Sequence, residues 1–192
     1  PAYRDSLDRE INRFQWSDFL GKTIQNSKKE VKYGFSIPTS AFHFNTVQGN
    51  NAKINLFYNR KWEKQKKSLR INAYNVYGFS DHKNYPGIQL DYLMDKVHYS
   101  KWLLRAERSL VQFDGESPIG LLMNSIYSLL LKKNYAKWYE NSKIEAHFST
   151  FLSHEFWVTI AAAHFQRNPR QNTTDKAYFN KHTIYQSNTP IN

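Results

Sequence analysis

The sequence predicts an α+β fold, mostly helical, with a ribbon-helix-helix-like dimeric core, additional N-terminal strands and additional C-terminal helices. Three observations lead to this fold class. Short β-branched and aromatic runs occur between residues 31 and 77. Apolar residues recur at helical spacing in the longer segments after Pro86. Residues 68–73 alternate polar and apolar side chains directly ahead of those segments, as a strand with one buried face does.

The first elements are short. Residues 4–20 place Leu7, Ile11 and Phe14 at helical spacing, which predicts a helix. Residues 31–38, 54–58 and 68–77 are β-branched or aromatic and predict strands, with a turn at residues 49–51 between the first two.

The clearest predicted helix covers residues 88–112, after the break at Pro86-Gly87. Lys101 and Arg108 interrupt its apolar face and are expected at the edge of it. Ser117 is a candidate N-cap for a second, central helix that runs to about Lys133. The residues expected on the main apolar face of the first helix are Leu90, Leu93, Met94, Val97, Leu104 and Val111.

The rest of the chain is predicted to be helical up to residue 165 and polar after it. Residues 136–165 are expected to form one or two helices. Residues 166–192 are rich in Asn and Thr, so we expect a loose tail. The predicted organisation is a single DNA-binding domain over residues 1–165, with its ribbon-helix-helix-like core at about 66–131, and the tail.

Composition favours an anionic partner. The 192 residues include 27 Lys+Arg against 16 Asp+Glu, a formal net charge of +11, which suits nucleic acid or a membrane surface, although solubility alone would also explain it. The chain has no cysteine, which excludes disulfide and thiol chemistry. Its most apolar run, residues 119–131, is too short and too broken to span a bilayer. We therefore expect a soluble, cytoplasmic, nucleoid-associated protein with no membrane partner; the first residues do not resemble a signal peptide, but a removed leader stays possible in principle.

Residues typical of catalytic or metal sites are scattered. His154 and His164 lie ten residues apart, whereas the zinc-protease pattern needs the second histidine four residues after the first. The sequence has neither a Gly-rich phosphate loop nor a serine elbow. The prediction is a protein that is not an enzyme, with no metal, cofactor or small-molecule ligand; if the chain were a toxin, His147, His154 and Glu155 would be its catalytic candidates.

A basic cluster lies next to the alternating strand. Six basic residues fall within eleven positions, opposed only by Glu63, a density typical of phosphate contacts, although a solvated loop would show it too. A two-stranded antiparallel ribbon, one strand from each of two chains, fits the DNA major groove and presents alternate side chains to the bases. We therefore predict a homodimer in which Ser68, Arg70 and Asn72 read bases. The predicted phosphate contacts are Arg60, Lys61, Lys64, Lys66 and Lys67.

Three stretches resemble the AcaB-like family of transcriptional regulators, which conjugative plasmids and integrating conjugative elements carry. They are "YPGIQ" at 85–89, "HYSKWLLRAERSL" at 98–110 and "SPIGLLMNSIYSLL" at 117–130. The match covers about 68–131, and Lys101 departs from the apolar or acidic residue usual there. The matching residues are Tyr99, Trp102, Leu103, Leu104, Arg105 and Glu107, then Ser117, Pro118, Gly120 and Leu121.

The resemblance implies a ribbon-helix-helix dimer that regulates transfer genes on a mobile element. Three other interpretations stay open. They are a basic effector or toxin domain acting on nucleic acid, an RNA-binding protein that stacks bases on exposed aromatic residues, and a structural protein.

Overall fold

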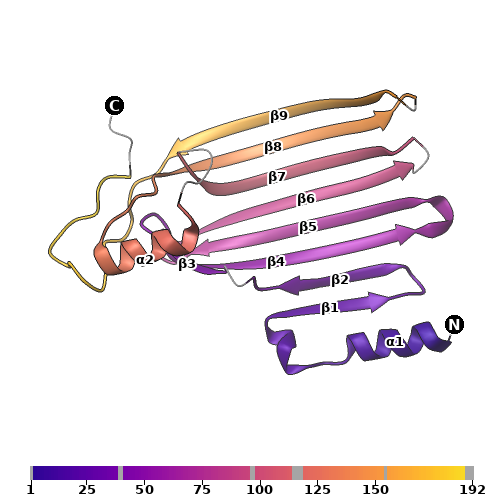
Figure 1. Cartoon of the computed structure of the whole chain (residues 1–192), viewed down its shortest axis with the longest axis horizontal. Helices are drawn as coiled ribbons and strands as arrows, with labels where there is room; N and C mark the ends of the chain where they lie inside the picture. Colours follow the sequence, from indigo (N-terminus) through magenta and orange to yellow (C-terminus); the bar gives the residue numbers. More distant parts are fainter. Residues whose placement is uncertain (1, 39–40, 96–97, 114–118, 154, 189–192) are drawn as a thin grey trace.

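The chain forms one large antiparallel sheet (Figure 1). The computed structural model describes residues 2–38, 41–95, 98–113, 119–153 and 155–188. Within them the sheet has nine strands in the order β1-β2-β4-β5-β6-β7-β8-β9, and β3 pairs with β4 off this path. The strands are β1 Gly21–Asn26, β2 Val31–Ser36, β3 Phe42–Asn45, β4 Gly49–Trp62, β5 Lys67–Gly78, β6 Lys83–Asp95, β7 Ser100–Gln112, β8 Trp138–Phe151 and β9 Trp157–Pro169.

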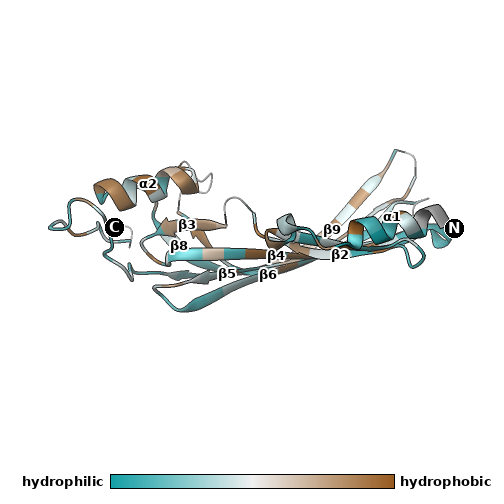
Figure 2. Cartoon of the chain, turned by 90° about the horizontal axis from the view of Figure 1, so that it is seen from below, coloured by the Kyte–Doolittle hydropathy of each residue, from teal (hydrophilic) through white to brown (hydrophobic). Residues whose placement is uncertain are grey.

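Helices are few and short. In the described ranges the α-helices are α1, Ala2–Asn12, and α2, Leu121–Leu131, with 3₁₀ turns at Trp16–Phe19 and Glu63–Gln65. Both α-helices have 11 residues, and no described helix has the length and hydropathy that crossing a membrane requires. Figure 2 shows both helices on the same side of the sheet.

Tight reversals connect β4 to β7, so each strand pairs with the next along the chain. The turns after β4 and β5 contain Lys66 and His82 in the left-handed backbone region, with φ of 54° and 52°. The connection from β7 to β8 is longer and includes α2. This arrangement leaves six adjacent strands, β4 to β9, with 12 to 14 residues each.

The predicted mostly helical, ribbon-helix-helix-like fold is wrong, and the segment 88–112 shows why. Instead of a helix it contains most of β6, the turn to the next strand, and β7. Alternate residues such as Ile88 and Leu90 lie on one side of the sheet, while Leu93 projects from the other side. Apolar residues on both faces of a strand imitate the spacing of a helix. Val97 lies outside the described residues.

The C-terminal part was predicted wrongly in the same way. The segment 136–165, expected to be helical, contains β8 and most of β9. The expected tail boundary at residue 165 falls inside β9. Residues 170–188 are fixed to the rest of the chain, since Tyr185 donates to the Ser128 carbonyl (2.7 Å) and Thr173 N–H donates to the Thr46 carbonyl (2.9 Å).

The N-terminal predictions were closer. A helix does form within residues 4–20, and the runs 31–38, 54–58 and 68–77 all contain strand. The predicted turn at 49–51 is the start of β4, and the chain reverses at residues 46–48. The second predicted helix is confirmed as α2, but its N-cap is Gly120. Ser117 lies outside the described residues.

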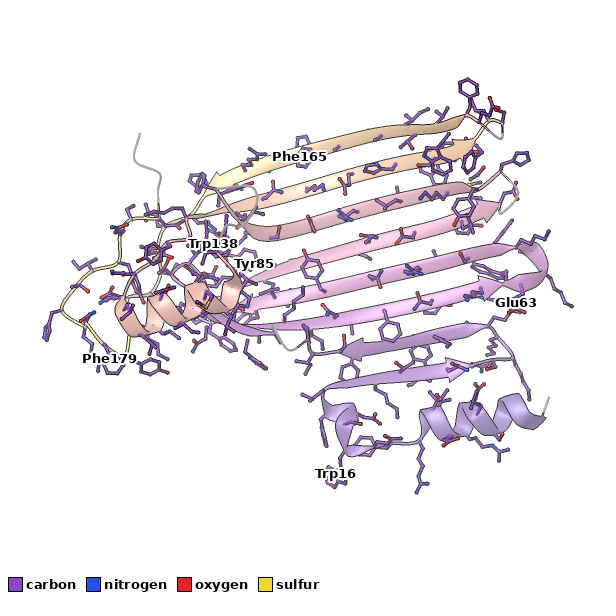
Figure 3. The ribbon with its side chains drawn as sticks, viewed as in Figure 1. Trp16, Glu63, Tyr85, Trp138, Phe165 and Phe179 are labelled. Carbon is purple, nitrogen blue, oxygen red and sulfur yellow. The ribbon has the colours of Figure 1, made fainter. Side chains whose placement is uncertain are left out.

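The buried core lies at one end of the sheet, under β3, α2 and residues 170–188. Trp138 packs there with Val47, Ala136 and Leu110, and Figure 3 places it beside α2, at the opposite end of the sheet from Glu63. Asn188 accepts from the Trp138 N–H (2.8 Å) and donates to the Trp138 carbonyl (2.6 Å). The C-terminal segment is thereby fastened directly to β8.

A buried carboxylate lies at the same end of the sheet as this core. Glu140 accepts from Arg108 at 2.9 Å and from Arg170 at 2.8 Å. The two guanidinium groups balance the charge of this buried carboxylate. Arg170 also donates to Tyr85, which in turn donates to Asp81.

Candidate functional site

The two faces of the sheet differ in chemistry, and the strand registers fix which residues share each face. The face called apolar here carries three residues from each of six strands, β4 to β9, aligned in three cross-strand rows. The rows are Leu56, Ala73, Ile88, Ala106, Ile144, His164; Tyr58, Ile71, Leu90, Leu104, Ala146, Ala162; and Arg60, Leu69, Tyr92, Trp102, Phe148, Ile160.

The apolar face is uncovered. Leu104 is 42% exposed, Ile144 64% and Ile160 68%. Among the 18 residues of the three rows Arg60 is the one permanently charged side chain, whereas 22% of the whole chain is charged. The middle of the face is aliphatic, and the third row ends it with Tyr92, Trp102 and Phe148. A continuous, exposed surface with a single permanent charge is rare on a protein in water.

The opposite face, called the polar face, carries charged and amide side chains. Arg105 contacts the Glu145 carboxylate at 2.9 Å and donates to the Gln89 side-chain oxygen at 2.7 Å. Lys143 contacts the same carboxylate at 2.7 Å. Glu145 is buried, and these two cations balance its charge.

Glycines on the polar face give room to aromatic rings. A Cβ on Gly87 would lie 2.2 Å from the Tyr74 ring, so this ring crosses directly over the glycine. Tyr74 then donates to Glu107 at 3.1 Å. Phe57 lies over Gly34 in the same way, since a Cβ on that glycine would lie 3.0 Å from the Phe57 ring.

A hollow of about 1090 Å³ lies on the polar face over β2, β4 and β5, with Leu7 of α1 at its rim. Asp8 of α1 accepts from Gln25 of β1 at 3.0 Å, which fixes the helix beside this face. The polar-face residues that line the hollow are Gln25, Lys32, Ser36, Asn55, Phe57, Asn59, Lys61, Ser68, Arg70, Asn72 and Tyr74.

The structure confirms the predicted alternation along residues 68–73. Ser68, Arg70 and Asn72 share the polar face and line the hollow together with Lys61. The other predicted DNA contacts do not gather there as a group. Arg60 belongs to the apolar face and stacks on Trp62 with 4.8 Å between guanidinium and ring, Lys64 and Lys66 belong to the turn after β4, and Lys67 projects from the apolar side of β5.

The ribbon that was to carry these residues into DNA is not present. β5 pairs with β4 along one edge and with β6 along the other. Both edges of the strand are therefore used inside one chain, and β5 cannot pair with a second copy. The prediction of a two-chain ribbon at residues 68–73 is wrong, while DNA binding itself is a separate question.

The catalytic candidates do not form a constellation. His147 lies on the polar face of β8, 3.7 Å from Glu145, and His164 lies on β9. Glu155 is exposed in the turn between these strands, and His154 lies outside the described residues. In the part of the chain that the structure describes, no group of three or more His, Asp or Glu residues is arranged to hold a metal ion.

Sequence reasoning missed the apolar face. Its signal is alternation: apolar residues stand at every second position through 88–92, 102–106, 144–148 and 158–162. Leu93, Leu103 and Ala161 on the other face hide that period, because they fill the gaps with apolar residues.

The comparisons with known proteins give a single family. The model for the C-terminal domain of a family of unknown function, DUF5686, matches residues 17–192. No curated protein and no solved structure matches the chain. The resemblance to the AcaB-like regulators is wrong, because the DUF5686 match covers the same residues and the "HYSKWLLRAERSL" segment is strand rather than helix. Five of the matching residues, Trp102 to Arg105 and Glu107, belong to β7.

Proposed function

The chain belongs to the DUF5686 C-terminal domain family, whose function is unknown, and from its two unlike faces we propose that it is a membrane-embedded sheet. The apolar face contacts the acyl chains of a lipid bilayer. The polar face borders water and carries the hollow and the ion pairs of Glu145. In this role the chain forms part of the wall between lipid and an aqueous space.

The observation that carries the proposal is the composition of the apolar face. At the average charge content of this chain, about four of its 18 residues would be charged, yet Arg60 alone is. Alternation of lipid-facing apolar residues with water-facing polar residues is the pattern of strands in membranes. A second sheet packed on this face would also exclude charge, but it would give no reason for an aliphatic middle that ends in Tyr92, Trp102 and Phe148.

Those aromatic residues suit a membrane boundary. Tyr92, Trp102 and Phe148 are cross-strand neighbours on β6, β7 and β8, and the Trp102 and Phe148 rings lie 4.9 Å apart. Tyrosine and tryptophan concentrate where hydrocarbon meets the headgroups, because they combine an apolar ring with a polar group. The third row would therefore lie at one surface of the bilayer.

Strand length agrees with this placement. β6, β7 and β9 have 13 residues each, and at about 3.3 Å per residue such a strand is about 43 Å long. Tilted by about 45°, it spans about 30 Å along the membrane normal, the thickness of the hydrocarbon core.

The edges of the sheet set a further condition. Backbone groups without partners are costly in hydrocarbon. At the β1 edge, the Asn12 side chain accepts from the Gln25 N–H at 2.8 Å and donates to the Gln25 carbonyl at 2.8 Å. β9 pairs only with β8 among the described strands, so the proposal requires another strand beside β9 in the membrane.

Quenching by lipid tests the proposal. In vesicles with brominated acyl chains, we expect strong quenching of a variant that keeps Trp102 as its one tryptophan, because that ring faces lipid. A variant that keeps only Trp138, which is 4% exposed within the end core, is the matched control and should be quenched weakly. Equal quenching of the two, or a chain that stays monodisperse in buffer and does not float with vesicles, would refute the proposal.

Duplex DNA binding is a second candidate, favoured by the net charge of +11. If it holds, the logarithm of affinity falls linearly with the logarithm of salt concentration, with a slope set by the phosphates neutralised. A filter-binding series from low to physiological salt measures this slope, and absence of binding at low salt ends this candidate. Light scattering in detergent tests the associated prediction of a homodimer.

A further inference from the structure

We propose that the hollow on the polar face binds a small anion that also carries hydroxyl groups, of the sugar-phosphate class. This inference goes beyond the membrane proposal and does not depend on it, because it rests on the residues that line the hollow and not on what contacts the apolar face. The hollow is lined by three basic side chains, Lys32, Lys61 and Arg70, together with side-chain amides. Among the described residues none of these three bases forms an ion pair.

The register places the three bases around one asparagine. Lys32 and Arg70 are the direct cross-strand neighbours of Asn59, one on each side, and Lys61 stands two residues further along β4. With adjacent strands about 4.8 Å apart, the backbones of Lys32 and Arg70 are about 10 Å apart. Long basic side chains converge over that distance on a single phosphate-sized group.

The nearby carboxylates are engaged elsewhere. Among the described residues no ion pair within 4.0 Å includes Lys32, Lys61 or Arg70. Asp91, the cross-strand neighbour of Arg70, accepts from Gln89 at 2.9 Å. Asp8 accepts from Ser27, and the pKa of Asp8 is lowered first by those hydrogen bonds and only last by the charge of Lys32.

Two acidic residues, Glu30 and Glu63, also line the hollow. The Glu30 carboxylate accepts from the Glu63 backbone N–H at 2.9 Å, which holds it at the turn between β1 and β2. Three basic residues of the polar face, Lys32, Lys61 and Arg70, face these two acids in the lining, so the hollow keeps a positive balance that favours an anion.

The side-chain amides that line the hollow favour a ligand with hydroxyl groups. The side-chain oxygen of Asn59 is buried and has no hydrogen-bond donor within the described residues. Such an acceptor calls for an O–H or N–H from outside the chain. Asn55, Asn72 and Ser68 line the same hollow, and the Phe57 ring over Gly34 adds a flat apolar surface beside them.

The volume of the hollow favours a small ligand over a nucleic-acid duplex. A volume of about 1090 Å³ is that of a small-molecule site, since such sites measure roughly 300–1,000 Å³. Leu7 of α1 and Glu63 of the turn after β4 lie at the hollow. The residues predicted to read DNA bases thus surround a space that fits one or two sugar rings.

Calorimetric titration of the full chain with glucose 6-phosphate tests the proposal, in detergent micelles and in detergent-free buffer. We expect the wild type to bind glucose 6-phosphate at least about tenfold more tightly than inorganic phosphate or glucose, since only the first offers both charge and hydroxyl groups. Arg70→Gln should weaken binding of glucose 6-phosphate at least about tenfold. Lys67→Gln, on the same strand but the opposite face, should change it less than about twofold.

Asn59→Leu separates the two parts of the site. It should remove the preference for glucose 6-phosphate over inorganic phosphate while leaving the affinity for phosphate within about twofold. The proposal is overturned if Arg70→Gln and Lys67→Gln have the same effect, or if the wild type does not prefer glucose 6-phosphate to phosphate. Failure of the lipid-quenching experiment would leave these results unaffected.

Discussion

Replacing Leu104 by arginine is expected to weaken insertion of the chain into a bilayer by about 2–4 kcal/mol, the measured range for arginine on a lipid-facing strand near the midplane. Leu104 lies in the middle row of the apolar face, between Leu90 and Ala146 on the neighbouring strands. It is 42% exposed, and hydrocarbon would cover it. The change corresponds to a loss of about 30- to 700-fold in the folded, inserted fraction, measured by urea titration in vesicles.

The adjacent residue provides the control. Leu103 is also a leucine on β7, but its side chain lies on the polar face between Asp91 and His147. Leu103→Arg places the same charge one residue away, where water and a carboxylate receive it, so we expect a change below about 1 kcal/mol. If Leu103→Arg weakens insertion as much as Leu104→Arg, the two faces do not differ in their surroundings, and the membrane proposal is wrong.

The sequence pattern predicted the local structure correctly where a segment showed a single hydrophobic period. Residues 68–73 alternate without interruption, and the structure confirms both the strand and the sharing of one face by Ser68, Arg70 and Asn72. What they face depends on β2 and on α1, which lie 32 or more residues earlier in the chain. Alternation in one strand carries no information on such distant neighbours, so the hollow was beyond prediction.

The wrong helix prediction for residues 88–112 arose because these strands carry apolar residues on both faces. In β6 and β7 the polar face carries Leu93, Leu103 and Val111 among its charged residues. Added to the alternating set, they reproduce helical spacing over 25 residues, 88–112. Pairing with adjacent strands decides the structure, because long hydrogen-bonded ladders on both sides of β6 outweigh the helical preference of its leucines. The pairing is non-local and cannot be read from the segment itself.

Replacing Trp138 by alanine is expected to destabilise the chain by about 3–5 kcal/mol, the usual cost of removing a buried tryptophan. Trp138 is 4% exposed and packs with Val47, Ala136 and Leu110, which bring together the β3–β4 turn, the segment after α2, and β7. Hydrogen exchange of residues 170–188 should accelerate in this variant, since Asn188 fastens that segment to the Trp138 backbone.

Two further variants test whether lost packing causes the destabilisation by Trp138→Ala. The Trp138 indole N–H has no partner among the described residues, so Trp138→Phe keeps most of the volume, removes an unsatisfied donor, and should cost less than about 1.5 kcal/mol. Trp16→Ala, at a residue that is 84% exposed, should cost less than about 0.5 kcal/mol. Urea unfolding in detergent measures all three variants. If Trp138→Ala is no more destabilising than Trp16→Ala, the end core does not stabilise the sheet, and its stability must come from the ladders of β4 to β9 alone.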